Sequence, residues 1–124
     1  MKDQRPKNLN LLTIRMPLPA IVSILHRLSG IILFFFIPVA LWGLQLSLTS
    51  EQDFTNLQVF FSNTAVKIIT WGLIAALIYH FVAGIRHLLM DIHIGEELKS
   101  GRITSVLTLI ISALLIILMG IWLW

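Results

Sequence analysis

The segment that decides the fold runs from position 79 to position 91 and reads YHFVAGIRHLLMD. It closes a long apolar stretch, so His80 is predicted to lie inside a membrane-spanning helix. At about 1.5 Å per residue, the steps from Asp91 back to His80 cover roughly 16 Å, or half of a hydrocarbon core about 30 Å thick. An ionisable side chain at that depth is costly to bury, and it is by default a candidate for function.

The same segment places four distinctive residues on one helix face. His80, Gly84, His87 and Asp91 are spaced i, i+4, i+7 and i+11, which aligns them along an α-helix. A buried imidazole, a glycine gap one turn away and polar groups near the water boundary suit a flat porphyrin. We therefore expect His80 to be an axial ligand of haem iron through Nε2, with Nδ1–H bonded to a backbone carbonyl. The alternative is an imidazole that bonds a carbonyl or hydroxyl of a neighbouring helix, as membrane helices also do.

The composition indicates a membrane protein. Of the 124 residues, 57% are hydrophobic and 12% are charged, whereas soluble domains carry about 25% charged residues. The apolar residues come in long runs, which predicts an all-α protein with three transmembrane helices at about 28–48, 66–90 and 103–124, in a single domain over 1–124. Pro38 predicts a kink in the first span, because proline removes a backbone hydrogen bond. The lack of cysteine excludes iron–sulfur and thiolate haem ligation by this chain.

Basic residues near the span ends predict the orientation. They precede the first span and lie in the link between the second and third spans, whereas the polar connection 49–64 carries none. The N-terminus and the second link are therefore expected in the cytoplasm. Three tryptophans then fall at the outer interface as an aromatic belt, namely Trp71, Trp122 and Trp124. Because the basic residues flank the spans, nucleic acid is not an expected partner.

A second group of candidate residues lies near the start of the first span. Ser23 and Arg27 are an i, i+4 pair, and His26 follows Ser23 by three residues, so all three can line one pocket on the cytoplasmic side. A hydroxyl and a guanidinium are donors suited to a quinone carbonyl that gains negative charge on reduction. His26 or Arg27 could instead hold a haem propionate. The simplest alternative is an ordinary basic anchor beside an unrelated serine.

The other histidines are predicted to lie closer to the membrane boundary than His80. His26, His87 and His93 are interpreted as too shallow to reach the opposite face of the same iron. A six-coordinate haem would then take its second ligand from another protein chain. His87 could still contact the propionates or relay protons.

The remaining distinctive residues are interpreted structurally. Arg86 and Asp91 are expected to be interfacial charges that end the second span. Ser29 and Gly30 are expected to be packing residues. The third span has no polar side chain deeper than Ser112, so it is expected to be structural.

Three motifs together resemble those of the cytochrome b subunit of succinate dehydrogenase, the larger-type membrane anchor of respiratory complex II. They are RPKNL at 5–9, SILHRLSG at 23–30 and HFVAGIRHLLMD at 80–91. The resemblance implies that His80 is the axial ligand of haem b and that Ser23 and Arg27 line a ubiquinone site. It also implies that His26, Arg27 and His87 lie on the haem-propionate side.

The resemblance further implies a heterotetramer, with higher oligomers allowed, in the bacterial inner (cytoplasmic) membrane. A flavoprotein would oxidise succinate in the tricarboxylic acid cycle, an iron–sulfur subunit would pass on the electrons, and a second small membrane anchor would share the haem and its helix bundle. This chain would then have no succinate-oxidising site of its own. Two alternatives remain open at this point: the anchor of a quinol:fumarate reductase, and a haem-free membrane scaffold or transporter subunit.

Overall fold

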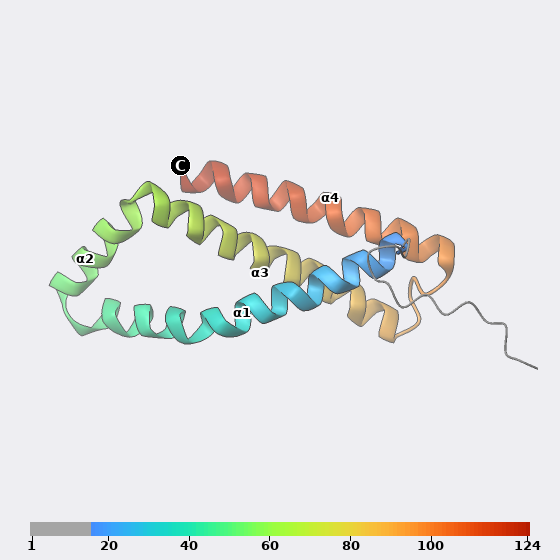
Figure 1. Cartoon of the computed structure of the whole chain (residues 1–124), viewed down its shortest axis with the longest axis horizontal. Helices are drawn as coiled ribbons and strands as arrows, with labels where there is room; N and C mark the ends of the chain where they lie inside the picture. Colours follow the sequence, from blue (N-terminus) through green and yellow to red (C-terminus); the bar gives the residue numbers. More distant parts are fainter. Residues whose placement is uncertain (1–15) are drawn as a thin grey trace, which may run out of the picture.

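The computed structural model describes residues 16–124, and this range is almost entirely helical. Its helices are α1 (Leu18–Thr49), α2 (Glu51–Ser62), α3 (Thr64–Asp91) and α4 (Leu98–Leu123) (Figure 1). Of these, α1, α3 and α4 are long and apolar enough to cross a membrane. The predicted all-α architecture with three transmembrane helices is thus confirmed. The motif at 5–9 and the basic residues up to Arg15 lie outside the described residues.

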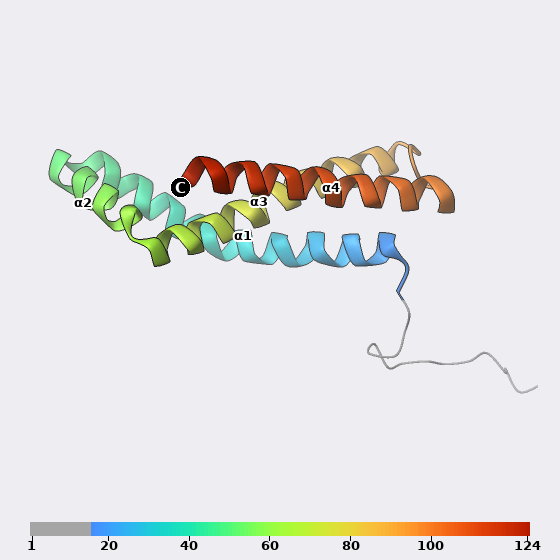
Figure 2. The same cartoon turned by 90° about the horizontal axis from the view of Figure 1, so that it is seen from above.

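Helix α3 packs against the other two long helices, α1 and α4, and also contacts α2. Helix α4 lies along α3, and α1 crosses α3 near the C-terminal end of α3 (Figures 1 and 2). The start of α1, the end of α3 and the start of α4 gather at one end of the molecule, while α2 lies at the other end (Figure 1). This is the arrangement expected of a chain that crosses a membrane three times.

Helix α1 has proline at its start and in its interior. It begins after Pro17, with Pro19 in its first turn, where the missing N–H has no helical partner to lose. The helix continues through Pro38 and changes direction over its second half (Figure 1). This course agrees with the predicted kink, because proline removes one hydrogen bond from the helix interior.

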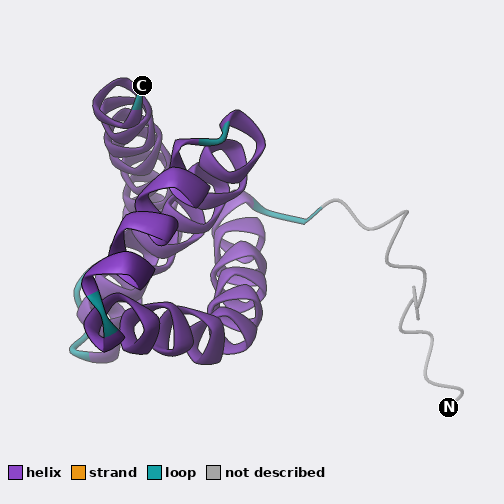
Figure 3. Cartoon of the chain, turned by 90° about the vertical axis from the view of Figure 1, so that its left-hand side faces the viewer, coloured by secondary structure: helices purple, strands orange, loops and turns teal. Residues whose placement is uncertain are grey.

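The connection between the first two spans is itself a helix, whereas the sequence predicted only a polar connection. Helix α2 occupies most of this polar segment and bridges the separated ends of α1 and α3 (Figure 3). The Ser50 hydroxyl accepts from the Asp53 N–H at 3.1 Å, and it donates to the Asp53 carboxylate at 2.7 Å. Asn63 then caps α3 by accepting from the Ala65 N–H at 2.9 Å. These caps stabilise sharp breaks between the helices.

Trp71 joins α3 to α4. Its indole N–H donates to the Ile116 carbonyl at 3.0 Å. Gly120 permits this approach, because a Cβ atom there would lie 3.1 Å from Trp71 Nε1. Trp122 and Trp124 are mostly exposed, as an aromatic belt requires, whereas Trp71 is half-buried and holds two helices together.

We predict that Gly120→Ala is less stable than Gly43→Ala by about 1 kcal/mol, the scale of one interhelical hydrogen bond in a membrane. Both changes give the same gain in helix propensity, but only the first displaces the Trp71 indole, since a Cβ at Gly43 meets nothing within 4 Å. Unfolding of the two variants in detergent, followed by tryptophan fluorescence, tests this. Equal stabilities would show that the Trp71 contact does not hold α3 to α4.

Candidate functional site

Three histidines meet between α1 and α3. The His26 ring of α1 stacks on the His80 ring of α3, with centroids 4.2 Å apart and planes 14° apart. The His87 ring lies on the other side, with its centroid 4.9 Å from that of His26 and its plane tilted by 44°. All three side chains are half-buried. The fold therefore brings together three of the site residues predicted from the sequence, with His26 in the middle.

The His26 ring occupies the space between the His80 and His87 rings. Its expected position closer to the membrane boundary than His80 stays a prediction. The expected gap above Gly84 is also filled, since a Cβ there would lie 3.4 Å from His26 Nε2. Even so, two nearly parallel stacked rings cannot bind opposite faces of one iron. His26 in this position is therefore not a second axial ligand.

One nitrogen of His80 is held by α1. His80 Nδ1 lies 3.2 Å from the His26 carbonyl oxygen and 3.1 Å from Ser29 Oγ. The Ser29 hydroxyl also donates to the same carbonyl at 2.7 Å. Gly30 lets the imidazole approach, because a Cβ there would lie 3.1 Å from His80 Cε1. Within residues 16–124, no hydrogen bond reaches His80 Nε2.

Ser29 was expected to be a packing residue, and its contact with His80 was missed. It is 5% exposed and lies three residues after His26, on the same face of α1. That spacing was visible in the sequence. It could not reveal the contact, because the register of α1 against α3 depends on how the two helices cross.

Ser23 and Arg27 do not form a closed pocket within residues 16–124. Arg27 is exposed and Ser23 is half-buried. Neither side chain makes a hydrogen bond to another residue between 16 and 124, and neither lines the groove between α3 and α4 or the groove between α1, α2 and α3. The pocket predicted for Ser23, His26 and Arg27 is therefore not complete in the described part of the chain.

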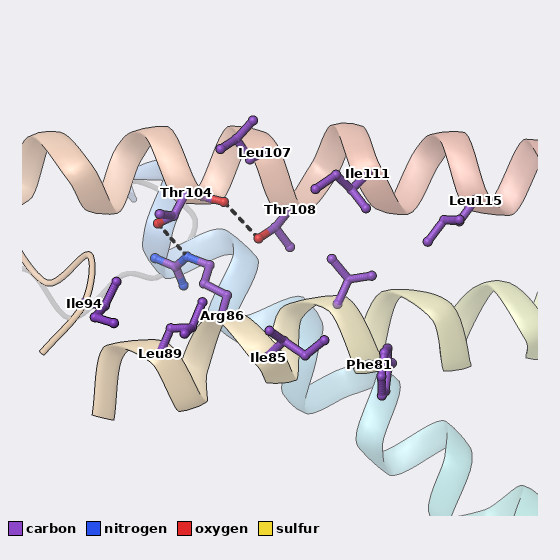
Figure 4. Close-up of a pocket in the computed structure, with 11 residues that line it drawn as sticks. Phe81, Ile85, Arg86, Leu89, Ile94, Thr104, Leu107, Thr108, Ile111 and Leu115 are labelled. Atoms are coloured by element: carbon purple, nitrogen blue, oxygen red, sulfur yellow. Dashed lines mark hydrogen bonds between the residues drawn. The ribbon is translucent and has the colours of Figure 1, made fainter. Parts of the chain in front are cut away.

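Arg86 is buried, which corrects the expectation of an interfacial charge. It is 4% exposed, and its Nε donates to Thr104 Oγ1 at 3.2 Å while Nη2 donates to the Gly101 carbonyl at 3.4 Å. The guanidinium lies at the end of a largely apolar groove of about 410 Å³ between α3 and α4 (Figure 4). Arg86 thus ties α3 to the first turns of α4, a helix that begins five residues earlier than predicted. Asp91 is exposed at the end of α3.

The histidine cluster does not suit a bare metal ion. Within residues 16–124, no three His, Asp or Glu side chains are arranged to hold one, and stacked rings keep their nitrogens from converging on a point. His80 alone offers one held nitrogen and one nitrogen without a hydrogen-bond partner in this range. A haem iron can take one axial protein ligand on each face, and a single imidazole of this kind fits one of those positions.

Comparison with known proteins shows the family of this chain. The chain matches the family described as succinate dehydrogenase/fumarate reductase transmembrane subunit over residues 1–119. The succinate dehydrogenase cytochrome b556 subunit of Coxiella burnetii is 37% identical over 125 aligned residues, covering 100% of both chains. The subunits of the same name from Rickettsia felis and Paracoccus denitrificans are each 34% identical, covering 94% and 84% of this chain and 91% and 80% of theirs. This chain belongs to the family of succinate dehydrogenase/fumarate reductase transmembrane subunits.

Proposed function

We propose that this chain, a membrane anchor subunit of succinate dehydrogenase, holds haem b through His80 and helps to form the quinone-reduction site through Ser23 and Arg27. The observation that carries the proposal is the environment of the His80 ring. The ring is half-buried between apolar helices, its Nδ1 is held by α1, and no residue in the described range bonds its Nε2. A metal-binding histidine commonly bonds a carbonyl or carboxylate with the nitrogen that does not bind the metal.

His80 is proposed to bind the haem iron through Nε2, and His26, His87 and Arg27 to bind the propionates. Haem b would supply one-electron chemistry when bound. The protein's part is to hold the ligand ring in place and to balance the charge of the propionates. Imidazole and guanidinium donors suit carboxylates, and the ring centroid of His26 lies within 5 Å of those of both other histidines.

Ser23 and Arg27 are proposed to bind a carbonyl oxygen of ubiquinone. They lie one turn apart on α1, with donors that no residue between 16 and 124 uses. A guanidinium and a hydroxyl aimed at this oxygen would stabilise the negative charge that it gains on reduction. Because Arg27 is exposed, the pocket needs a second wall from another subunit. We assign that wall to the iron–sulfur subunit.

The proposed assembly is a heterotetramer in the bacterial inner membrane, with the N-terminus of this chain in the cytoplasm and with higher oligomers allowed. A second small anchor would supply the other haem ligand, since the stacked His26 ring cannot do so. The flavoprotein would contain the succinate-oxidising site, which we do not assign to this chain. The relatives are named as succinate dehydrogenase subunits, which favours this function over a fumarate reductase anchor or a haem-free scaffold.

We predict that His80→Ala removes or alters the reduced b-type haem spectrum of the purified complex, because it deletes the proposed axial nitrogen. His93→Ala is the matched control, since its side chain is 84% exposed and bonds only Glu96 among the described residues. Optical spectra of both variants, normalised to co-purified flavin, give the result. An unchanged haem spectrum in His80→Ala would remove His80 from the ligand position.

We predict that Arg27→Ala lowers quinone reduction by roughly 10- to 100-fold, the scale of a hydrogen bond from a charged donor. Electron transfer from succinate to a soluble dye should stay unchanged, because that path does not use this chain's quinone donors. Arg102→Ala, another exposed arginine, serves as the control. If both activities of Arg27→Ala fall equally, the residue acts in assembly and not in quinone binding.

A further inference from the structure

We infer that Ser29 is a positioning residue for the haem ligand: its hydroxyl oxygen accepts the Nδ1–H of His80 and fixes the tautomer that leaves Nε2 free. The role toward haem rests on the proposed function of His80. The hydrogen-bond geometry itself does not, because it is present in the chain alone.

The position of the protons follows from three contacts. The shortest is the one from Ser29 Oγ to the His26 carbonyl at 2.7 Å, and a carbonyl can only accept, so the serine proton lies there. Ser29 Oγ therefore turns a lone pair toward His80 Nδ1, 3.1 Å away. The His26 carbonyl, 3.2 Å from the same nitrogen, is a second acceptor. With acceptors on both sides, Nδ1 carries the ring proton, and Nε2 keeps its lone pair.

The burial of Ser29 strengthens the effect of its hydrogen bond on the His80 ring. Ser29 is 5% exposed, so water does not compete for Nδ1–H. An unpaired donor in such a place is strongly unfavourable, and the ring would otherwise change its tautomer or turn away. Gly30 adds to the constraint, since it lets the His80 ring lie directly against α1. Ser47 shows the contrast: its hydroxyl makes the same type of bond to the Leu44 carbonyl at 2.6 Å, but on an exposed face.

The hydrogen bond to His80 Nδ1 should lower the reduction potential of an iron held by Nε2. A ring whose N–H is shared by two acceptors is a more electron-rich ligand, and such ligands favour the oxidised metal. Loss of the serine acceptor should therefore raise the reduction potential of the haem. It should also weaken haem retention, since loss of such an outer contact typically reduces metal affinity about 10- to 100-fold.

The test compares Ser29→Ala, Ser29→Thr and Ser47→Ala in the purified complex. Redox titration of the haem bands and electron paramagnetic resonance of the oxidised haem are the readouts. We expect a higher potential and an altered resonance for Ser29→Ala, and wild-type values for Ser47→Ala and for Ser29→Thr, which keeps the hydroxyl. If Ser29→Ala keeps its haem with wild-type potential and resonance, the inference is overturned.

Haem loss is also informative. Haem lost from Ser29→Ala but kept by Ser29→Thr supports the hydroxyl contact, whereas equal loss from both variants overturns it.

A haem-independent readout separates this inference from the proposed function. In the full chain in lipid, nitrogen NMR of labelled histidine should show His80 protonated at Nδ1, and mixed tautomers in Ser29→Ala. A complex without haem whose His80 still shows this tautomer would refute the ligand proposal and leave the Ser29 contact intact.

Discussion

The ring of His80 lies between apolar helices, where its N–H group must find an acceptor within the protein. Helix α1 supplies that acceptor, and the crossing of α1 over α3 is built around it. Small residues at the crossing permit close approach, with Gly30 beside the ring and Ala83 fully buried. The Tyr79 hydroxyl donates to the Val22 carbonyl at 2.9 Å and adds a second polar tie at the same crossing. The His80 ring and the Tyr79 hydroxyl thus both tie α3 to α1 at this crossing.

Where α3 packs against α4, polar side chains of α3 bond α4 directly. Arg86 and Trp71 both donate hydrogen bonds to α4, Arg86 to its first turns and Trp71 toward its C-terminal end. The histidine cluster lies instead between α1 and α3. His80 Nε2 has no hydrogen-bond partner within residues 16–124, and Arg27 is exposed. Both features support the proposal that other subunits complete the site of this chain, which belongs to a family of transmembrane subunits.

Hydropathy and helical spacing predicted the three long helices, because long apolar runs depend little on tertiary context. The position of His80 within the second of them followed from the same pattern. The stacking of His26 on His80, the Ser29 contact and the burial of Arg86 could not be predicted, since each depends on the register between two helices. Helix α2 was missed because its polar composition resembles a loop, although its Ser50 cap was visible.

The most direct test of the shared haem site is a reduced-minus-oxidised optical spectrum of the complex purified through a tag on this chain. The co-purifying proteins should be identified in the same sample. If this chain is an anchor that shares a haem, the sample should show a b-type haem spectrum. It should also contain a flavoprotein, an iron–sulfur protein and a second small membrane protein. Partners without haem would contradict the role of His80 as an iron ligand. If the purified material contained neither haem nor these partners, that result would contradict the proposal that this chain forms half of a shared haem site.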